Sequence, residues 1–236
     1  MIQFGHLTVG QQPRVVGTIS TWEFLRRARE VSCDIVEVRL DLIGAEAGDW
    51  VAECRRLQSL GVPVILTIRL AGEGGQWTGS EEERLRLFLA GAPVVSAMDL
   101  ELRSDVLRLM SAPPKPVIVS YHDFERTPPL PALLAIVAEA ARRGSVVKIA
   151  TLLQTADDVE SLRQLLRQPW SVPLCVMGMG ALGAETRVEF PRLGSSLTYG
   201  YLDAAVAPGQ VSAGELWQRL GRSLPGSHTA RNRHGL

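Results

Sequence analysis

Eight short apolar segments recur along the chain, each followed by a longer segment with a different pattern. The apolar segments have the length of β-strands and lie at Arg14–Thr18, Asp34–Leu40, Pro63–Ile68, Val94–Leu100, Pro116–Tyr121, Val146–Ala150, Leu174–Met179 and Ser196–Tyr201. Between them, the i, i+3, i+4 spacing of amphipathic helices covers Thr21–Val31, Trp50–Leu60, Glu81–Ala90, Leu130–Arg143 and Asp157–Arg167. Alternating strands and helices form parallel sheets with right-handed crossovers, and eight units allow the sheet to close. The pattern predicts an α/β protein with a (β/α)8 TIM barrel; the alternative is an open, doubly wound sheet.

The chain of 236 residues has nearly the length of one such barrel, which is about 250 residues. We therefore expect a single barrel domain over residues 1–220. The segment Met1–Val9 precedes the first strand and is predicted to form a short N-terminal hairpin that covers one end of the barrel. Residues 221–236 are rich in Gly, Ser, Arg and His without an apolar period, which is typical of a disordered tail.

Charge and composition argue against several classes of partner. Basic and acidic side chains number 25 each, so no charge excess favours binding to nucleic acid or to an anionic membrane. No apolar run approaches the ~18 residues of a membrane-spanning helix, and the first residues lack the order of a signal peptide. We expect a cytoplasmic protein in which Cys33, Cys54 and Cys175 are reduced thiols in the core, neither disulfides nor zinc ligands.

Charged side chains interrupt strands that should be apolar on both faces. In the second strand, Glu37, Arg39 and Asp41 alternate with apolar residues and therefore share one face. If the apolar face contacts the helices, the charged face points into the barrel near the carboxyl end of the strand, where active sites of this fold lie. The alternative is an edge strand with one solvated face.

Other predicted strands also end in polar or charged side chains. These are Arg69 after the third strand, with Glu73 in the loop that follows, Asp99 and Glu101 in the fourth, Ser120 and His122 in the fifth, and Lys148 in the sixth. Because a barrel places all these strand ends around one mouth, we expect the side chains to form one constellation.

Lys148 carries the sharpest chemical signal. Of the 25 basic residues only Lys115 and Lys148 are lysines, and Lys115 lies in a proline-rich loop where it is expected to be solvated. Burying an ammonium group is costly unless it is paired or loses its proton. Lys148 is thus either a salt-bridged core residue or an amine kept neutral by burial and by Arg39, and a neutral amine is a nucleophile toward a carbonyl carbon.

His122 is the only histidine between the N-terminal segment, which holds His6, and the predicted tail, which holds His228 and His234. An imidazole titrates near pH ~6.5, which suits a group that must take and return a proton near neutrality. Because its strand directly precedes the strand of Lys148, both side chains can face one bound molecule. The alternative is a hydrogen-bonded core histidine without a chemical role.

Taken together, these segments resemble the type I 3-dehydroquinate dehydratases, and the match spans nearly the whole chain. The segments are VEVRLDL at Val36–Leu42, TIR and EGG within Thr67–Gly75, DLEL at Asp99–Leu102, SYHDFERTP at Ser120–Pro128, VKIAT at Val147–Thr151, MGMGALGAETR at Met177–Arg187 and APGQ at Ala207–Gln210. The resemblance implies a (β/α)8 barrel that is usually a homodimer in bacteria and that needs no metal or cofactor.

The resemblance also implies a reaction and the residues that perform it. Lys148 would form a Schiff base with the C3 ketone of 3-dehydroquinate, and His122 would remove the C2 proton and then assist loss of the C1 hydroxyl as water. Glu73 would orient and polarise His122. Arg187 matches the arginine that binds the substrate carboxylate, a role that suits its planar fork.

Further positions match substrate-binding residues of the family. Polar contacts or electrostatics are implied for Glu37, Arg39 and Arg69, apolar pocket lining for Phe124, Met177 and Met179, and a place in the closing loop for Gln210. Two positions depart from the family pattern. Val206 stands where a serine that touches the substrate is frequent, and Thr186 stands where a serine is common.

Other interpretations remain open at this point. The glycines Gly178, Gly180 and Gly183 satisfy G-x-G-x-x-G, a dinucleotide-binding motif. Pro191 and Gly194 predict that the long helix required by that motif is interrupted. An aldolase could use the same amine for carbon–carbon cleavage, and a non-catalytic metabolite-binding barrel would be expected to lack Lys148 or His122.

Overall fold

The computed structural model describes residues 1–29, 31–206 and 209–221, and its eight-stranded parallel sheet confirms the predicted barrel. The strands are β3 (Arg14–Ile19), β4 (Ile35–Arg39), β5 (Val64–Thr67), β6 (Ala97–Glu101), β7 (Val117–Asp123), β8 (Val146–Leu152), β9 (Leu174–Met179) and β10 (Leu197–Tyr201). Their spatial order is β10-β3-β4-β5-β6-β7-β8-β9. The two strands at the ends of this order, β10 and β9, are also linked, because the N–H of Ser196, just before β10, donates to the carbonyl of Leu174 in β9 at 2.8 Å. This bond links the starts of β9 and β10, where the barrel closes.

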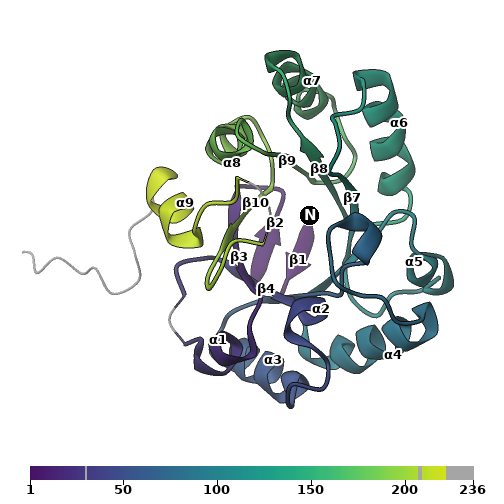
Figure 1. The fold of residues 1–236 in the computed structure, drawn as a ribbon, viewed down its shortest axis with the longest axis vertical. Coiled ribbons are helices and arrows are strands. Elements are labelled where there is room, and N and C mark those ends of the chain that lie inside the picture. The colour runs from purple at the N-terminus through teal and green to yellow at the C-terminus, as the bar shows by residue number, and fades with distance from the viewer. Residues whose placement is uncertain (30, 207–208, 222–236) are drawn as a thin grey trace, which may run out of the picture.

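The helices form an outer ring around the strands (Figure 1). They are α1 (Trp22–Arg27), α2 (Leu40–Ile43), α3 (Trp50–Ser59), α4 (Glu81–Gly91), α5 (Asp105–Leu109), α6 (Leu130–Ala141), α7 (Ala156–Leu166), α8 (Gly183–Arg192) and α9 (Ala213–Arg219), with 3₁₀ turns η1 (Ala71–Glu73) and η2 (Ala92–Val94). Local signals explain where several of them begin. Ser80 caps α4, and Thr155 forms a capping box with Asp158 at the start of α7.

Helix α8 contradicts the prediction that Pro191 and Gly194 interrupt a helix after β9. It runs from Gly183 to Arg192, and Pro191 lies in its last turn. A proline there leaves the carbonyl four residues earlier, that of Arg187, without a helical N–H partner. The Thr198 hydroxyl donates to this carbonyl at 2.8 Å. The helix therefore tolerates the proline because β10 supplies the missing hydrogen bond.

The N-terminal hairpin is present as predicted. Strands β1 (Ile2–Phe4) and β2 (Leu7–Val9) pair antiparallel, and in Figure 1 they lie in the middle of the ring of strands. The side chains of Phe4 and Val9 are completely buried and belong to the apolar cluster inside the barrel. The hairpin therefore covers one end of the barrel, and the predicted tail over residues 221–236 lies, apart from Gly221, outside the described residues.

The barrel interior is layered along its axis. At the hairpin end it is apolar, with Val16, Ile35, Ile65, Ile118 and Val146 in one cluster. Further along the same strand faces, two residues toward each carboxyl end, the interior becomes polar. Those positions hold Thr18, Glu37, Thr67, Ser120 and Lys148, all of them buried. The strands thus carry polar groups into the barrel only near the end where the pocket lies.

Candidate active site

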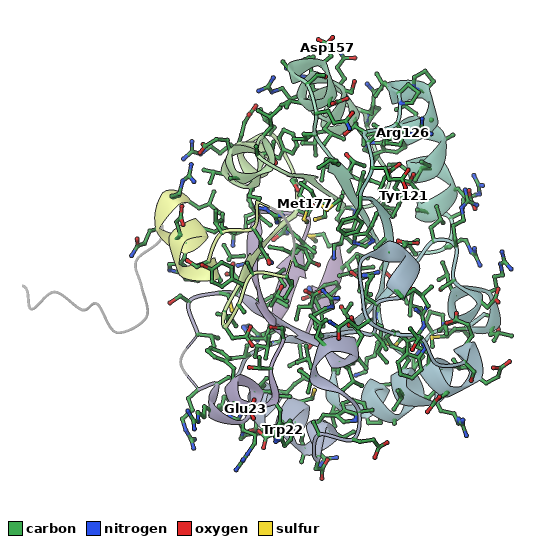
Figure 2. The ribbon with its side chains drawn as sticks, viewed as in Figure 1. Trp22, Glu23, Tyr121, Arg126, Asp157 and Met177 are labelled. Carbon is green, nitrogen blue, oxygen red and sulfur yellow. The ribbon has the colours of Figure 1, made fainter. Side chains whose placement is uncertain are left out.

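One pocket lies at the carboxyl ends of the strands, and the eleven residues to which the family resemblance assigns a place in the site all line it. These are Glu37, Arg39, Arg69, Glu73, His122, Phe124, Lys148, Met177, Met179, Arg187 and Gln210. Thr18, Gly74, Ala150, Tyr199 and Val206 complete the lining. Figure 2 shows Met177 inside the ring of strands, whereas Asp157 lies at the outer edge of the molecule. The closure of the barrel therefore brings together residues that are up to 192 positions apart, from Thr18 to Gln210.

Lys148 projects into this pocket from the middle of β8 and is 5% exposed. Its Nζ donates to Asp99 Oδ2 at 3.0 Å and lies 3.8 Å from Glu37 Oε1. The nitrogen also lies 4.2 Å from the centre of the Tyr199 ring, a cation–π geometry. The partners of the nitrogen are thus two carboxylates and an aromatic face.

Arg39 is turned toward a different partner. Its Nε and Nη2 donate to the two carboxylate oxygens of Asp41 at 2.9 and 2.8 Å. Asp41 also accepts the backbone N–H of Gln76, so this bidentate pair ties the end of β4 to the loop after β5. Arg39 still lines the pocket, but its charge is directly compensated by Asp41.

Asp99 connects Lys148 with a buried arginine. Its Oδ1 accepts from Arg69 Nη2 at 2.7 Å and from the Ser120 hydroxyl at 2.6 Å. Burial alone would raise the pKa of this carboxyl, but Arg69 and Lys148 lower it well below its usual range. Asp99 therefore stays a carboxylate throughout the neutral pH range and holds the Lys148 amine in a fixed place.

Glu37 is held by hydroxyl groups from both neighbouring strands. Its Oε2 accepts from the Thr18 hydroxyl at 2.8 Å, and its Oε1 accepts from the Thr67 hydroxyl at 2.9 Å. The side chain is 3% exposed. These two bonds aim a carboxylate at the pocket close to the Lys148 nitrogen.

His122 lies on β7, next to β8, and is fixed by Glu73. Its Nδ1 is 2.9 Å from Glu73 Oε2, which also accepts the His122 backbone N–H at 3.2 Å. With Nδ1–H donating to this carboxylate, the lone pair of the ring is on Nε2. The Phe124 ring is stacked on the imidazole at 6.4 Å between centroids. Glu73 and Phe124 together fix the orientation of the imidazole.

The environment separates the pKa values of the two members of this pair. Burial, together with the positive charges of Arg69 and Lys148, lowers the pKa of His122 well below its ordinary value. Burial raises the pKa of Glu73 to about 7. The imidazole is therefore neutral near pH 7, the state in which it can accept a proton.

Arg187 is a buried cation without an acidic partner among the ion pairs of the described residues. It projects from α8, is 2% exposed, and its Nη1 donates only to the Tyr199 carbonyl at 3.0 Å and to Met177 Sδ at 3.4 Å. Its Nε has no hydrogen-bond partner within the described part of the chain. Burial lowers the pKa of Arg187 to about 10. Such a guanidinium is suited to an anionic group supplied by a ligand.

Gln210 and Val206 form the edge of the pocket after β10. The Val206 N–H donates to Gln210 Oε1 at 2.8 Å. The two residues between Val206 and Gly209, the first half of the APGQ segment, lie outside the described residues. An apolar side chain at position 206 offers no hydroxyl to the pocket.

The sequence predicts most of the residues that line the pocket, but not all of them and not all of their partners. Asp99 was placed at the site without a role, and Tyr199 and Thr18 were not singled out. The signal was present in the alternation of each strand. Thr18 and Tyr199 line the pocket with Glu37 and Lys148, and Asp99 faces inward to bond Lys148. An aromatic or hydroxyl side chain in an apolar run is simply a weaker signal than a charge.

The glycine motif after β9 serves packing in this fold. A Cβ at Gly183 would lie 2.5 Å from the Gly178 carbonyl oxygen, and Gly180 has φ +81°. The glycines therefore let α8 approach β9 closely. A strand, a turn and a helix are all present, so it is the closed barrel, and not an interrupted helix, that argues against a dinucleotide-binding sheet.

In the part of the chain that the structure describes, no group of three or more His, Cys, Asp or Glu side chains is arranged to hold a metal ion. No described helix has both the length and the apolar character to cross a lipid bilayer. Cys33, Cys54 and Cys175 are free and buried.

Comparison with known proteins identifies the family. The sequence model of the type I 3-dehydroquinase family matches residues 20–223. The chain belongs to the type I 3-dehydroquinases. Members of this family are carbon–oxygen lyases, and we therefore classify the chain as an enzyme of that class.

This chain is similar to curated and to solved type I 3-dehydroquinases over most of its length and most of theirs. The 3-dehydroquinate dehydratase of Methanocella arvoryzae is 34% identical over 212 residues, 88% of this chain and 95% of the relative. That of Methanothrix thermoacetophila is 38% identical over 195 residues, 80% of this chain and 82% of the relative. The crystal structure of 3-dehydroquinate dehydratase from Geobacillus kaustophilus has a TM-score of 0.80 at 29% identity, covering 90% of this chain and 91% of that one.

Proposed function

We propose that this type I 3-dehydroquinase dehydrates 3-dehydroquinate to 3-dehydroshikimate through a Schiff base on Lys148. The observation that carries the proposal is that a buried amine, a neutral imidazole and an arginine without an acidic partner line one pocket. These are the groups needed to bind a keto acid, attack its carbonyl and move a proton. The chemistry uses only side chains and needs no cofactor.

The first step forms the imine. A protonated amine has no lone pair, so Nζ must give up a proton before it attacks the C3 carbonyl carbon. Asp99 stays ionised and cannot keep that proton, whereas the neutral His122 imidazole can accept it. Attack gives a carbinolamine. The protonated His122 returns its proton to the carbinolamine hydroxyl, which leaves as water, so that His122 is neutral again and an iminium joins Nζ to C3.

The second step removes water from the substrate. The iminium acidifies the C2 hydrogen, because the electron pair of the C2–H bond moves toward nitrogen and forms an enamine. Nε2 of His122 takes this proton and then delivers a proton to the C1 hydroxyl. The electron pair returns as the C1–O bond breaks, so a C1–C2 double bond and one water form. A second water hydrolyses the iminium and releases 3-dehydroshikimate from Lys148.

Substrate binding is assigned to the remaining groups of the pocket. The buried fork of Arg187 would hold the carboxylate through parallel hydrogen bonds. Glu37, Arg39 and Arg69 offer polar contacts to the ring hydroxyls, while Met179 and Phe124 supply apolar walls. Val206 replaces one hydrogen-bonding side chain of the family pattern, so we expect one contact fewer at that edge.

Borohydride trapping tests the mechanism. The protein is incubated with 3-dehydroquinate and borohydride, and the adduct is located by peptide mass spectrometry. We expect a covalent addition confined to Lys148 and absent from Lys148→Ala. The variant His122→Ala should still form the adduct but turn over about 10²–10⁴ times more slowly, the usual contribution of general acid–base catalysis. Turnover without any adduct on Lys148 would falsify the imine.

Assembly and location rest on different grounds. We infer a homodimer from the family resemblance, and a cytoplasmic location from the free thiols at all three cysteines. Sedimentation equilibrium of the full chain measures the assembly, and a mass of one chain over the working concentration range contradicts the dimer.

A further inference from the structure

A second buried arginine lies outside the pocket, on the outer ring of helices. Arg84 projects from α4 and is completely buried. Its Nη2 donates to Glu101 Oε2 at 2.8 Å, its Nη1 donates to the Ile68 carbonyl at 3.1 Å, and its Nε lies 3.1 Å from Glu81. It does not line the pocket. A fully desolvated cation is costly to the fold, and a buried ion pair is weak evidence for stability.

Glu101 connects this arginine with the pocket. One oxygen of its carboxylate accepts from Arg84, and the other accepts from Arg69 Nη1 at 2.9 Å and from the Leu70 N–H at 3.1 Å. Glu101 ends β6 and is completely buried. A single carboxylate therefore joins the outside of the barrel to two separate parts of the site.

The first part is the lysine. Arg69, held by Glu101, donates to one oxygen of Asp99 at 2.7 Å, and the other oxygen accepts from Lys148 Nζ at 3.0 Å. Five buried charges thus alternate in sign from Arg84 to the reacting nitrogen. A displacement of Glu101 moves the fork of Arg69 and, with it, the carboxylate that fixes the amine.

The second part is the histidine. The Leu70 N–H bonded to Glu101 begins the turn η1, and the Leu70 carbonyl accepts the N–H groups of Glu73 and Gly75, both at 3.0 Å. Glu73 in turn holds His122 through Nδ1 at 2.9 Å. The Glu101 carboxylate therefore also fixes the base of the loop that orients the imidazole.

We infer that Arg84 is a positioning residue for the reaction. It acts through Glu101 to hold the side chains of Lys148 and His122 in fixed positions relative to each other. This inference rests on the proposed function of the site, but it concerns a residue that never contacts substrate. Arg84 bonds Glu101 from helix α4, on the outside of the barrel and away from the pocket. Its planar fork suits this task, because it bonds Glu101 and the Ile68 carbonyl at the same time.

The direct test is Arg84→Met, which keeps an unbranched apolar stem and removes the fork and the charge. We expect kcat with 3-dehydroquinate to fall at least about ten-fold, because misplacement of catalytic groups lowers the rate steeply. KM should rise less than about three-fold, since the carboxylate-binding Arg187 is unchanged.

A second measurement does not depend on turnover. The titration of His122 is followed by NMR of histidine-labelled free protein, with His122→Ala to assign the signal. The charged groups facing His122 are Glu73 from η1, Arg69 from the segment after β5, and Arg39, Asp99 and Lys148 from the strands. Arg84 is one of the buried charges that alternate in sign from Arg84 to Lys148. Removing its positive charge makes the electrostatic potential at the site more negative. The midpoint of His122 should therefore move to higher pH in Arg84→Met.

Two further variants separate positioning from folding. Arg163→Met on α7 removes an arginine that forms a bidentate pair with Glu189 away from the site, at 2.6 and 3.0 Å, and should leave kcat and the His122 midpoint unchanged. Arg84→Lys keeps the charge but not the fork, so it should keep the midpoint and lose part of kcat.

The outcomes are distinct. A folded Arg84→Met protein with the kcat and the His122 midpoint of the wild type overturns the inference. If Arg84→Met does not fold, an Arg84→Lys protein with wild-type kcat overturns it. Absence of 3-dehydroquinate turnover in the wild type contradicts the proposed function instead, and the His122 titration then still decides the role of Arg84.

Discussion

Glu73 couples the stability of the fold to pH. Burial raises the pKa of its carboxyl from 4.5 to about 7, so the folded protein holds this proton more tightly than the unfolded chain does. The resulting stabilisation is fully present below pH 4.5 and is lost as the pH rises through about 7. At about 1.4 kcal/mol per pKa unit, ionisation of Glu73 lowers the free energy of unfolding by about 3 kcal/mol.

Glu73→Gln removes this titration while keeping the size of the side chain. We expect the free energy of unfolding of the variant, relative to the wild type, to rise by about 3 kcal/mol from about pH 4 to about pH 8. Urea denaturation at a series of pH values measures the difference. Glu125→Gln, at an exposed position in the loop after β7, is the matched control. A difference for Glu73→Gln that is no larger than that for Glu125→Gln would show that the Glu73 carboxyl is not perturbed.

At the same scale, the sequence predicts which side chains face the pocket but not which of them pair. Alternation along a strand assigns Arg39 and Lys148 to inward faces. The relative shift of neighbouring strands decides which inward residues share a layer. In the structure Lys148 pairs with Asp99 of another strand, and Arg39 pairs with Asp41 of its own segment. The expected influence of Arg39 on the amine stays a prediction, and both residues line the pocket.

At the scale of elements, strands were easier to predict than helices. Each of the eight predicted strands overlaps an observed one, because burial on both faces leaves a run of apolar residues. Helix α5 (Asp105–Leu109) was missed because five residues are too few to show an apolar period. Helix α8 was missed because the bond from Thr198 that accommodates Pro191 comes from another element and has no local signal.

The packing of α8 on β9 gives a prediction at this scale. A Cβ at Gly183 would lie 2.5 Å from the backbone oxygen of Gly178, so Gly183→Ala must push the helix away from the strand. Arg187 is on this helix and moves with it. We expect a lower melting temperature and a KM for 3-dehydroquinate that is raised about ten-fold, the effect of about 1.4 kcal/mol.

Gly214→Ala is the control for this helix substitution. Gly214 is the second residue of α9, and a Cβ there would find only Ser32 Cβ at 3.9 Å. Alanine is the better helix former by about 1 kcal/mol, so this variant should melt at a slightly higher temperature with an unchanged KM. Equal KM values for the two variants would show that α8 does not need its close approach to β9.

At the scale of the whole molecule, the two ends of the barrel have separate tasks. The hairpin closes one end with apolar side chains, and the polar layers begin only beyond them, toward the pocket. In barrels of this type the end away from the active site serves stability. Closure of the sheet also explains why scattered charges in the sequence could be predicted to share one site, because eight parallel strand ends must meet at one mouth.

Phe4 tests this division between the two ends. Its ring is completely buried inside the hairpin end of the barrel and does not line the pocket. Phe4→Ala leaves a cavity there and should lower the free energy of unfolding by about 3–5 kcal/mol. Because the hairpin contributes nothing to the pocket lining, kcat and KM of the folded fraction should stay within about two-fold of the wild type. Chemical denaturation and steady-state kinetics below the melting temperature measure both quantities. A large loss of kcat in a variant that remains folded would mean that the hairpin end controls the geometry of the site.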